Sequence, residues 1–138
     1  MKIWRVDHIT LTLDGVPIGP YMERHLLGPE HAKALTDMAM SHTDDDHRSP
    51  HLDSRILDIF PEEYCGFTSE EALYEWFANW TAALDAAGFL VRTYEVPRAE
   101  VRCGANGQVV FTMGAARLLT ASPLNLNPVQ LEIPGVCL

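Results

Sequence analysis

The sequence predicts a single small domain of the α+β class, with a mixed or antiparallel sheet packed against one main amphipathic helix and one or two short helices. Its 138 residues suit one domain, which we expect to span 1–138. Hydrophobic residues make up 47% and charged residues 21%, which is typical of a chain that buries a core. A β-rich run comes first, helical patterns follow, and two β-rich runs come after them.

The N-terminal half begins with a predicted strand from Lys2 to Leu13, which the turn signal Asp14-Gly15 ends. Alternation assigns its residues to two faces, with Trp4, Val6 and His8 on one and Ile3, Arg5 and Asp7 on the other. The following segments are predicted as a Pro- and Gly-rich loop over 15–29, a short helix over 30–40, a polar surface loop over 41–53, and a helical turn over 54–60.

The main helix is predicted from Glu70 to Ala87, because apolar residues recur there at spacings of three and four. That stripe comprises Leu73, Trp76, Phe77, Trp80, Leu84 and Ala87. Thr68 and Glu71 form a capping-box pattern, and Gly88 provides a C-terminal stop. We interpret the aromatic residues of the stripe as core, because their spacing is that of a core-facing helix rather than of a ligand-stacking platform.

Two further strands are predicted in the C-terminal half. Leu90–Val96 is β-rich and stops at Pro97, and Gln108–Thr112 follows the turn region of Gly104 and Gly107. Residues 122–138 contain three prolines and no periodicity, so we expect them to lie extended over the surface.

The charge balance excludes some function classes. The formal net charge of −9 argues against direct nucleic-acid binding and against an anionic lipid surface. No apolar run reaches the length of a membrane span, and charged residues interrupt any signal-peptide core at the N-terminus. Three cysteines without a repeated spacing favour a reducing compartment. We therefore expect a cytoplasmic protein with no membrane contact.

Two sets of residues could be chemically reactive, but the sequence signal for each of them is weak. His42, His47 and His51 surround Asp44–Asp46 and offer metal-ligand chemistry, but their spacing matches no known metal signature and a polar loop lacks rigid support. We favour a solvated loop and expect no metal. Cys65 precedes Gly66 near a helix start, where a thiol pKa can fall, but no Cys-His motif accompanies it. We favour a buried structural cysteine.

A third set of residues is spread along the chain: Arg5 in the first strand, Phe67-Thr68-Ser69 before the main helix, and Gln108 at the start of a late strand. In this order and approximate spacing, the sequence resembles the ADP-ribosyltransferase-like fold. In that family a first-strand Arg or His holds NAD, a Ser-Thr-Ser type segment supports the nicotinamide pocket, and a late-strand Glu polarises the ribose 2′-hydroxyl. The resemblance implies NAD as cofactor, with Arg5, Thr68 and Ser69 as cofactor-binding residues and Gln108 at the catalytic position.

The chain departs from that pattern at the catalytic carboxylate. If Gln108 opens a Gln-x-Glu motif, the expected Glu is replaced by Val110. If Gln108 replaces the Glu itself, its amide can bond the ribose but has no negative charge to stabilise an oxocarbenium-like transition state. The resemblance therefore implies an NAD-dependent ADP-ribosyltransferase whose catalytic Glu is not evident.

A wider set of motifs is also similar to a family of small bacteriophage and prophage proteins, over most of the chain. These motifs are IWRVDH, GPY at 19–21, CGFTSEEALYEWF, GFLVRTYEVP and GQVVF. Two hypotheses follow. The first is a phage accessory protein that binds NAD and modifies a host protein. The alternative is a non-enzymatic acidic protein that binds and inhibits a host factor, for instance one of a defence system.

Overall fold

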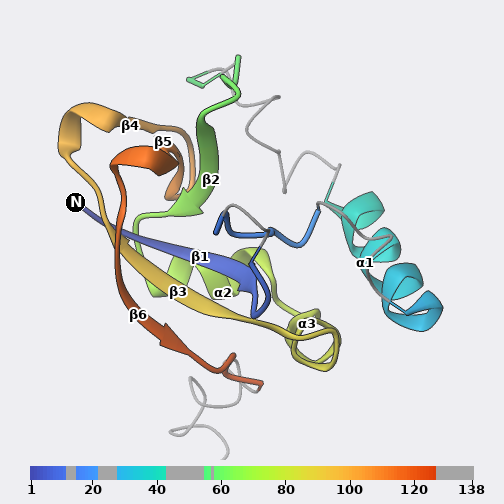
Figure 1. Cartoon of the computed structure of the whole chain (residues 1–138). Helices are drawn as coiled ribbons and strands as arrows, with labels where there is room; N and C mark the ends of the chain where they lie inside the picture. Colours follow the sequence, from blue (N-terminus) through green and yellow to red (C-terminus); the bar gives the residue numbers. More distant parts are fainter. Residues whose placement is uncertain (12–14, 22–27, 43–54, 57, 127–138) are drawn as a thin grey trace, which may run out of the picture.

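An antiparallel sheet with helices over one face is the framework of the protein in a computed structural model, which describes residues 1–11, 15–21, 28–42, 55, 56 and 58–126 (Figure 1). Within these residues the sheet has six strands in the order β4-β5-β2-β1-β3-β6, and all pairings are antiparallel. The strands are β1 Lys2–His8, β2 Glu63–Phe67, β3 Phe89–Glu95, β4 Val101–Cys103, β5 Gln108–Thr112 and β6 Arg117–Ser122. The helices are α1 Pro29–Ser41, α2 Glu70–Trp76 and α3 Thr81–Ala86. The predicted α+β class is confirmed.

Three of the six strands in the described residues are the ones that the sequence predicted. β5 has the predicted bounds, and β3 is shifted by one residue from Leu90–Val96. β1 has the predicted alternation but ends at His8, where the chain leaves the sheet and the Ile9 amide donates to the carbonyl of Gly88. The sequence patterns missed β2, β4 and β6.

The prediction of one continuous helix over 70–87 is wrong, because the structure has two helices there. α2 ends at Trp76, a tight turn follows in which the Trp80 amide donates to the carbonyl of Phe77, and α3 begins at Thr81. Asn79 in this turn has a φ of 76°, a left-handed conformation that interrupts the helical backbone. The apolar spacing survives the break, because Leu73, Phe77, Leu84 and Ala87 are all buried in one core while Trp76 and Trp80 are partly buried against it.

Two hydrophobic cores lie on opposite faces of the sheet. Val6, Phe67 and Val91 face the helices, and α1 adds Leu35 and Met38 to that core. The second core lies on the other face and consists of Ile3, Tyr94, Val96, Val109 and Phe111. The rings of Tyr94 on β3 and Phe111 on β5 are 6.1 Å apart although β1 and β2 separate these strands in the sheet. The sheet is therefore strongly curled around the second core.

Part of the described C-terminal segment, 122–126, packs against the helices, and the prediction of an extended segment over 122–138 stays a prediction. Leu124 is buried in the helix-side core, the Asn125 amide donates to the hydroxyl of Tyr74, and the carbonyl of Leu126 accepts from Thr81. The rest of the segment, 127–138, lies outside the described residues. No helix in the described ranges is long and apolar enough to cross a membrane.

Candidate functional site

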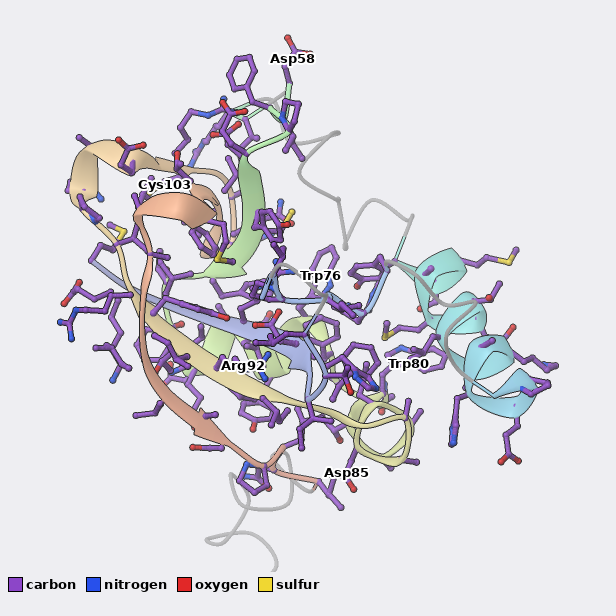
Figure 2. The ribbon with its side chains drawn as sticks, in the orientation of Figure 1. Asp58, Trp76, Trp80, Asp85, Arg92 and Cys103 are labelled. Atoms are coloured by element: carbon purple, nitrogen blue, oxygen red, sulfur yellow. The ribbon has the colours of Figure 1, made fainter. Side chains whose placement is uncertain are left out.

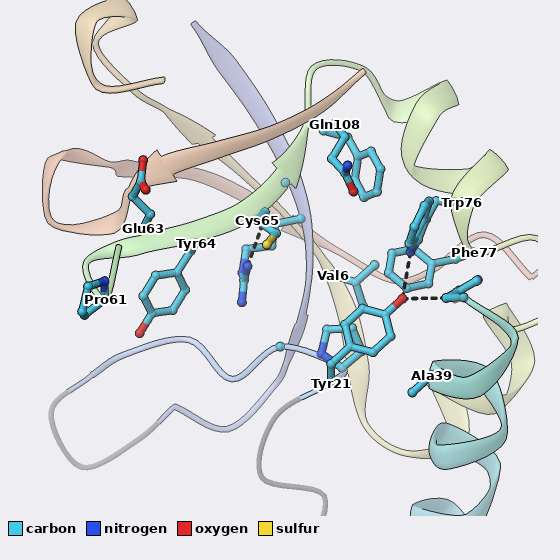
Figure 3. A pocket seen from close by; sticks show the side chains of 16 residues that line it. Val6, Tyr21, Ala39, Pro61, Glu63, Tyr64, Cys65, Trp76, Phe77 and Gln108 are labelled. Atoms are coloured by element: carbon cyan, nitrogen blue, oxygen red, sulfur yellow. Dashed lines mark hydrogen bonds between the residues drawn. The ribbon is translucent and has the colours of Figure 1, made fainter. Parts of the chain in front are cut away.

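A pocket of about 440 Å³ opens where β1 and β2 separate (Figure 3). The two strands pair at Trp4 and Phe67. Beyond that point the guanidinium of Arg5 fills the gap, donating from Nη1 to the carbonyl of Cys65 at 2.6 Å. Segment 19–21, the C-terminal end of α1 and helix α2 complete the walls. We call this cavity the aromatic pocket, because five of its lining residues are Tyr21, Tyr64, Phe67, Trp76 and Phe77.

Tyr21 is the centre of a hydrogen-bonded wall of the pocket. The indole Nε1 of Trp76 donates to its hydroxyl oxygen at 2.8 Å, and the same oxygen lies 2.6 Å from Nδ1 of His42. Because an indole N–H can only donate, the tyrosine proton is left for His42, whose Nδ1 then accepts. A phenol is protonated at neutral pH at its ordinary pKa of about 10, and burial raises the pKa of Tyr21 further, so its hydroxyl can act as this donor. The wall thus ties three separate segments together.

His42 departs from the predicted polar loop. Its side chain is only 4% exposed, and its ring lies 4.8 Å from that of Trp76. The prediction of a solvated residue at this position is wrong, because α1 extends to Ser41 and delivers the imidazole into the wall. His47, His51 and Asp44–Asp46 lie outside the described residues, so the expectation of no metal there stays a prediction.

Arg5 is buried in an ion-pair network. Its Nε donates to Asp7 at 2.5 Å, the hydroxyl of Tyr94 donates to the other carboxylate oxygen at 2.7 Å, and Arg92 lies 3.7 Å from that oxygen. The guanidinium also lies 5.0 Å from the centre of the Tyr64 ring. Arg5 therefore joins β1 to β2 and forms part of the pocket floor at the same time.

Gln108 and Arg5 reach the pocket from opposite faces of the sheet. Gln108 pairs with Phe67, and Phe67 with Trp4, so these three side chains share a face and Arg5 starts from the other one. Both nevertheless line the pocket, because the Arg5 side chain extends into the gap between β1 and β2. The structure thus brings these two predicted site residues to one cavity.

Thr68 and Ser69 do not line the pocket. The hydroxyl of Ser69 caps α2 by accepting from the amide of Ala72 at 3.1 Å. Thr68, which the sequence pattern suggested as the cap, instead donates to the carbonyl of Gly107 at 3.5 Å. Both hydroxyls have structural partners, and neither contributes to the pocket surface.

Cys65 is accessible in the pocket and is not the buried structural cysteine that we expected. Protein atoms still surround its sulfur, and this burial raises the pKa of the thiol, although the charge of Arg5 opposes the shift. At the far end of the pocket, the hydrogen bond from Arg102 lowers the pKa of Glu63. Sequence reasoning missed Tyr21 and Trp76 as pocket residues, and the only signal for Tyr21 was its place in the GPY motif.

The fold and the pocket together define a small α+β domain with an aromatic cavity at a split in its sheet. The chain belongs to the Bacteriophage T4 Y00F protein family, whose family model matches residues 1–125. This confirms the predicted relation to phage proteins. Searches of the curated proteins and of the solved structures found no match. The resemblance to ADP-ribosyltransferases stays a prediction.

Proposed function

We propose that this protein is a phage accessory protein whose aromatic pocket binds a small molecule that contains an aromatic ring. The observation that carries the proposal is the cavity itself. Its volume of about 440 Å³ lies within the range of roughly 300–1,000 Å³ that is usual for ligand pockets. Its walls combine aromatic rings with a few polar groups, of which Gln108 and Arg5 are two. This combination is typical of sites that stack a flat ligand and fix its orientation.

NAD is the first ligand to test, because the ADP-ribosyltransferase resemblance implies it. NAD as the ligand is supported by the fact that Arg5 and Gln108 line the same pocket. In this proposal the nicotinamide end enters the pocket and Gln108 bonds to it or to its ribose. Transfer of ADP-ribose to a host protein would need a negative charge near the ribose, which Gln108 lacks, so Gln108→Glu is the variant in which transfer is to be sought.

A thermal-shift titration tests binding. A ligand that binds only the folded state stabilises it by about 2.7 kcal/mol at a concentration of 100 Kd. NAD should raise the melting temperature of the wild type and of Trp80→Leu, because Trp80 packs against the helix-side core but does not line the pocket. The matched variant Trp76→Leu removes a ring from the pocket wall and should lose the shift. An NAD shift of equal size in both variants would place binding elsewhere.

Binding of a host protein without catalysis is the second candidate, and the surface of α2 and α3 favours it. Residues 70–87 contain no Lys or Arg, and the four acidic residues there, Glu70, Glu71, Glu75 and Asp85, are exposed. Such a surface attracts a basic partner. If this is the function, Glu71→Lys with Glu75→Lys should abolish capture of the host partner at low salt, whereas Trp76→Leu should leave it intact. The reverse pattern would favour the pocket.

A further inference from the structure

We propose that the ligand portion recognised by the aromatic pocket is a planar ring without negative charge, such as a nucleobase or nicotinamide, held without a contact to phosphate. This inference rests on the proposed function and specifies its ligand class. It states that the pocket recognises the ring of a nucleotide and not its phosphates. This statement can be wrong while the proposed function is right.

The charged groups of the pocket already have partners. Arg5 pairs with Asp7, whose side chain is completely buried, and it also bonds the carbonyl of Cys65. Glu63 receives two hydrogen bonds from Arg102, at 2.7 and 2.8 Å. Two of the five N–H donors of Arg5 are used in these contacts, and a phosphate on the others would have to share the guanidinium with the buried carboxylate of Asp7 and lie close to that negative charge. The net charge of −9 further disfavours an anionic ligand.

The aromatic wall offers ring faces to a ligand. The polar atoms of Trp76 and Tyr21 bond each other and His42, so their hydrogen-bonding capacity is largely used within the wall. The Tyr21 ring is stacked on Phe77, with the ring planes 24° apart. Figure 3 shows Tyr21, Trp76 and Phe77 gathered at one end of the pocket, Tyr64 at the other and Cys65 between them. Stacking on such faces suits a flat ring of any heteroatom pattern.

Gln108 contributes to the pocket lining an amide that has a partner within the protein, and because a side-chain amide has two N–H donors and an acceptor oxygen, one partner does not use all of its hydrogen-bonding capacity. Gln108 is 6% exposed and lies near Trp76 in Figure 3. Nucleobases and nicotinamide carry donors and acceptors on their edges, so the amide matches their chemistry while the rings cover their faces. A saturated or anionic ligand would not use this combination of groups.

The test compares nucleosides, which carry no phosphate, with their 5′-monophosphates. Adenosine, guanosine, cytidine, thymidine and nicotinamide riboside are each titrated beside the corresponding nucleotide, and NAD is included. Binding is measured by tryptophan fluorescence and by protection of Cys65 from alkylation, read by mass spectrometry. Cys103 is the reference thiol, because it is exposed on β4 and lies well apart from Trp76 in Figure 2.

At least one nucleoside should bind as tightly as its monophosphate, protect Cys65 but not Cys103, and show less than about a twofold change in affinity between low and high salt. Trp76→Leu should weaken this binding at least tenfold, whereas Trp80→Leu should not. Binding of NAD or nucleotides without binding of any nucleoside would overturn the inference and leave the proposed function standing. If no member of the panel, NAD included, binds, the inference and the proposed ring-binding function fall together.

Discussion

Asp7 is a completely buried carboxylate that lies between two buried arginines, Arg5 on the same strand and Arg92 on β3. It accepts hydrogen bonds from Arg5 and Tyr94 and lies 3.7 Å from Arg92. All buried side-chain polar atoms of the described residues have hydrogen-bond partners. Burial raises the pKa of Tyr94, and the charge of Asp7 adds to the shift, so the phenol remains a donor to the carboxylate. The network is satisfied as a unit, and each member depends on the others.

Removing the charge of Asp7 should therefore strongly destabilise the folded protein. We expect Asp7→Asn to lower the free energy of unfolding by about 3 kcal/mol or more, because two buried guanidinium groups lose their counter-charge. The matched control is Asp37→Asn, which breaks the exposed pair with Lys33 and should cost less than about 1 kcal/mol. Urea unfolding measures both values. Equal effects of the two variants would contradict the assigned role of the network.

Glu63 should make stability depend on pH on the acid side. The hydrogen bond from Arg102 holds its pKa below the ordinary value of 4.5, so between the folded pKa and 4.5 the unfolded chain binds the proton more readily. The stabilisation is fully present above about pH 4.5 and is lost as the pH falls through the folded value. Glu63→Gln should flatten this part of the pH profile of unfolding, and Glu62→Gln at the exposed neighbouring position should not. If the free energy of unfolding of Glu63→Gln fell with decreasing pH as steeply as that of the wild type, the pair of Glu63 and Arg102 would not contribute to the acid dependence of stability.

At the scale of elements, β2 determines the geometry of the pocket. Gly66 lies directly against β1, because a Cβ there would be 2.5 Å from Cγ2 of Ile3 and 3.1 Å from the carbonyl oxygen of Trp4. Only glycine permits this approach. One residue earlier, the carbonyl of Cys65 accepts from Arg5 instead of from a β1 amide, and the split in the sheet begins.

Gly66→Ala should therefore destabilise the fold through overpacking, by about 1–3 kcal/mol. Gly114→Ala is the matched control, because a Cβ at Gly114 would meet nothing within 4 Å and its backbone is not left-handed. The control should stay within about 0.5 kcal/mol of the wild type. Chemical denaturation gives both numbers, and a neutral Gly66→Ala would mean that the two strands are not held in close contact.

These elements also show what the sequence could predict. β-rich runs next to turn signals or proline predicted β1, β3 and β5, and residues in helical spacing predicted α1. The EYCGF segment of β2 contains a glycine required by a neighbouring strand and no clear alternation, so only tertiary structure identifies it. The pocket was predictable only in part. Arg5 and Gln108 were found through a family resemblance, whereas Tyr21 and His42 meet through contacts between segments that are remote in sequence.

For the whole molecule, the curled sheet is shared by two cores, and this arrangement should make them unfold together. β1 contributes Ile3 to one core and Val6 to the other, so neither core can be lost while the strand keeps its place. The three tryptophans, Trp4, Trp76 and Trp80, all pack against the helix-side core. Their fluorescence therefore reports on one core, whereas far-ultraviolet circular dichroism reports on the backbone of both.

Ile3→Ala removes side-chain volume from the second core alone and should still shift the unfolding of the first. Burial of Ile3 is complete, so we expect a loss of about 2–5 kcal/mol, similar to that of Leu73→Ala in the helix-side core. In both variants the midpoints from fluorescence and circular dichroism should coincide, because a single cooperative domain has one transition. A variant Ile3→Ala whose circular dichroism changes at lower denaturant while its tryptophan fluorescence keeps the wild-type midpoint would show instead that the two faces of the sheet unfold separately.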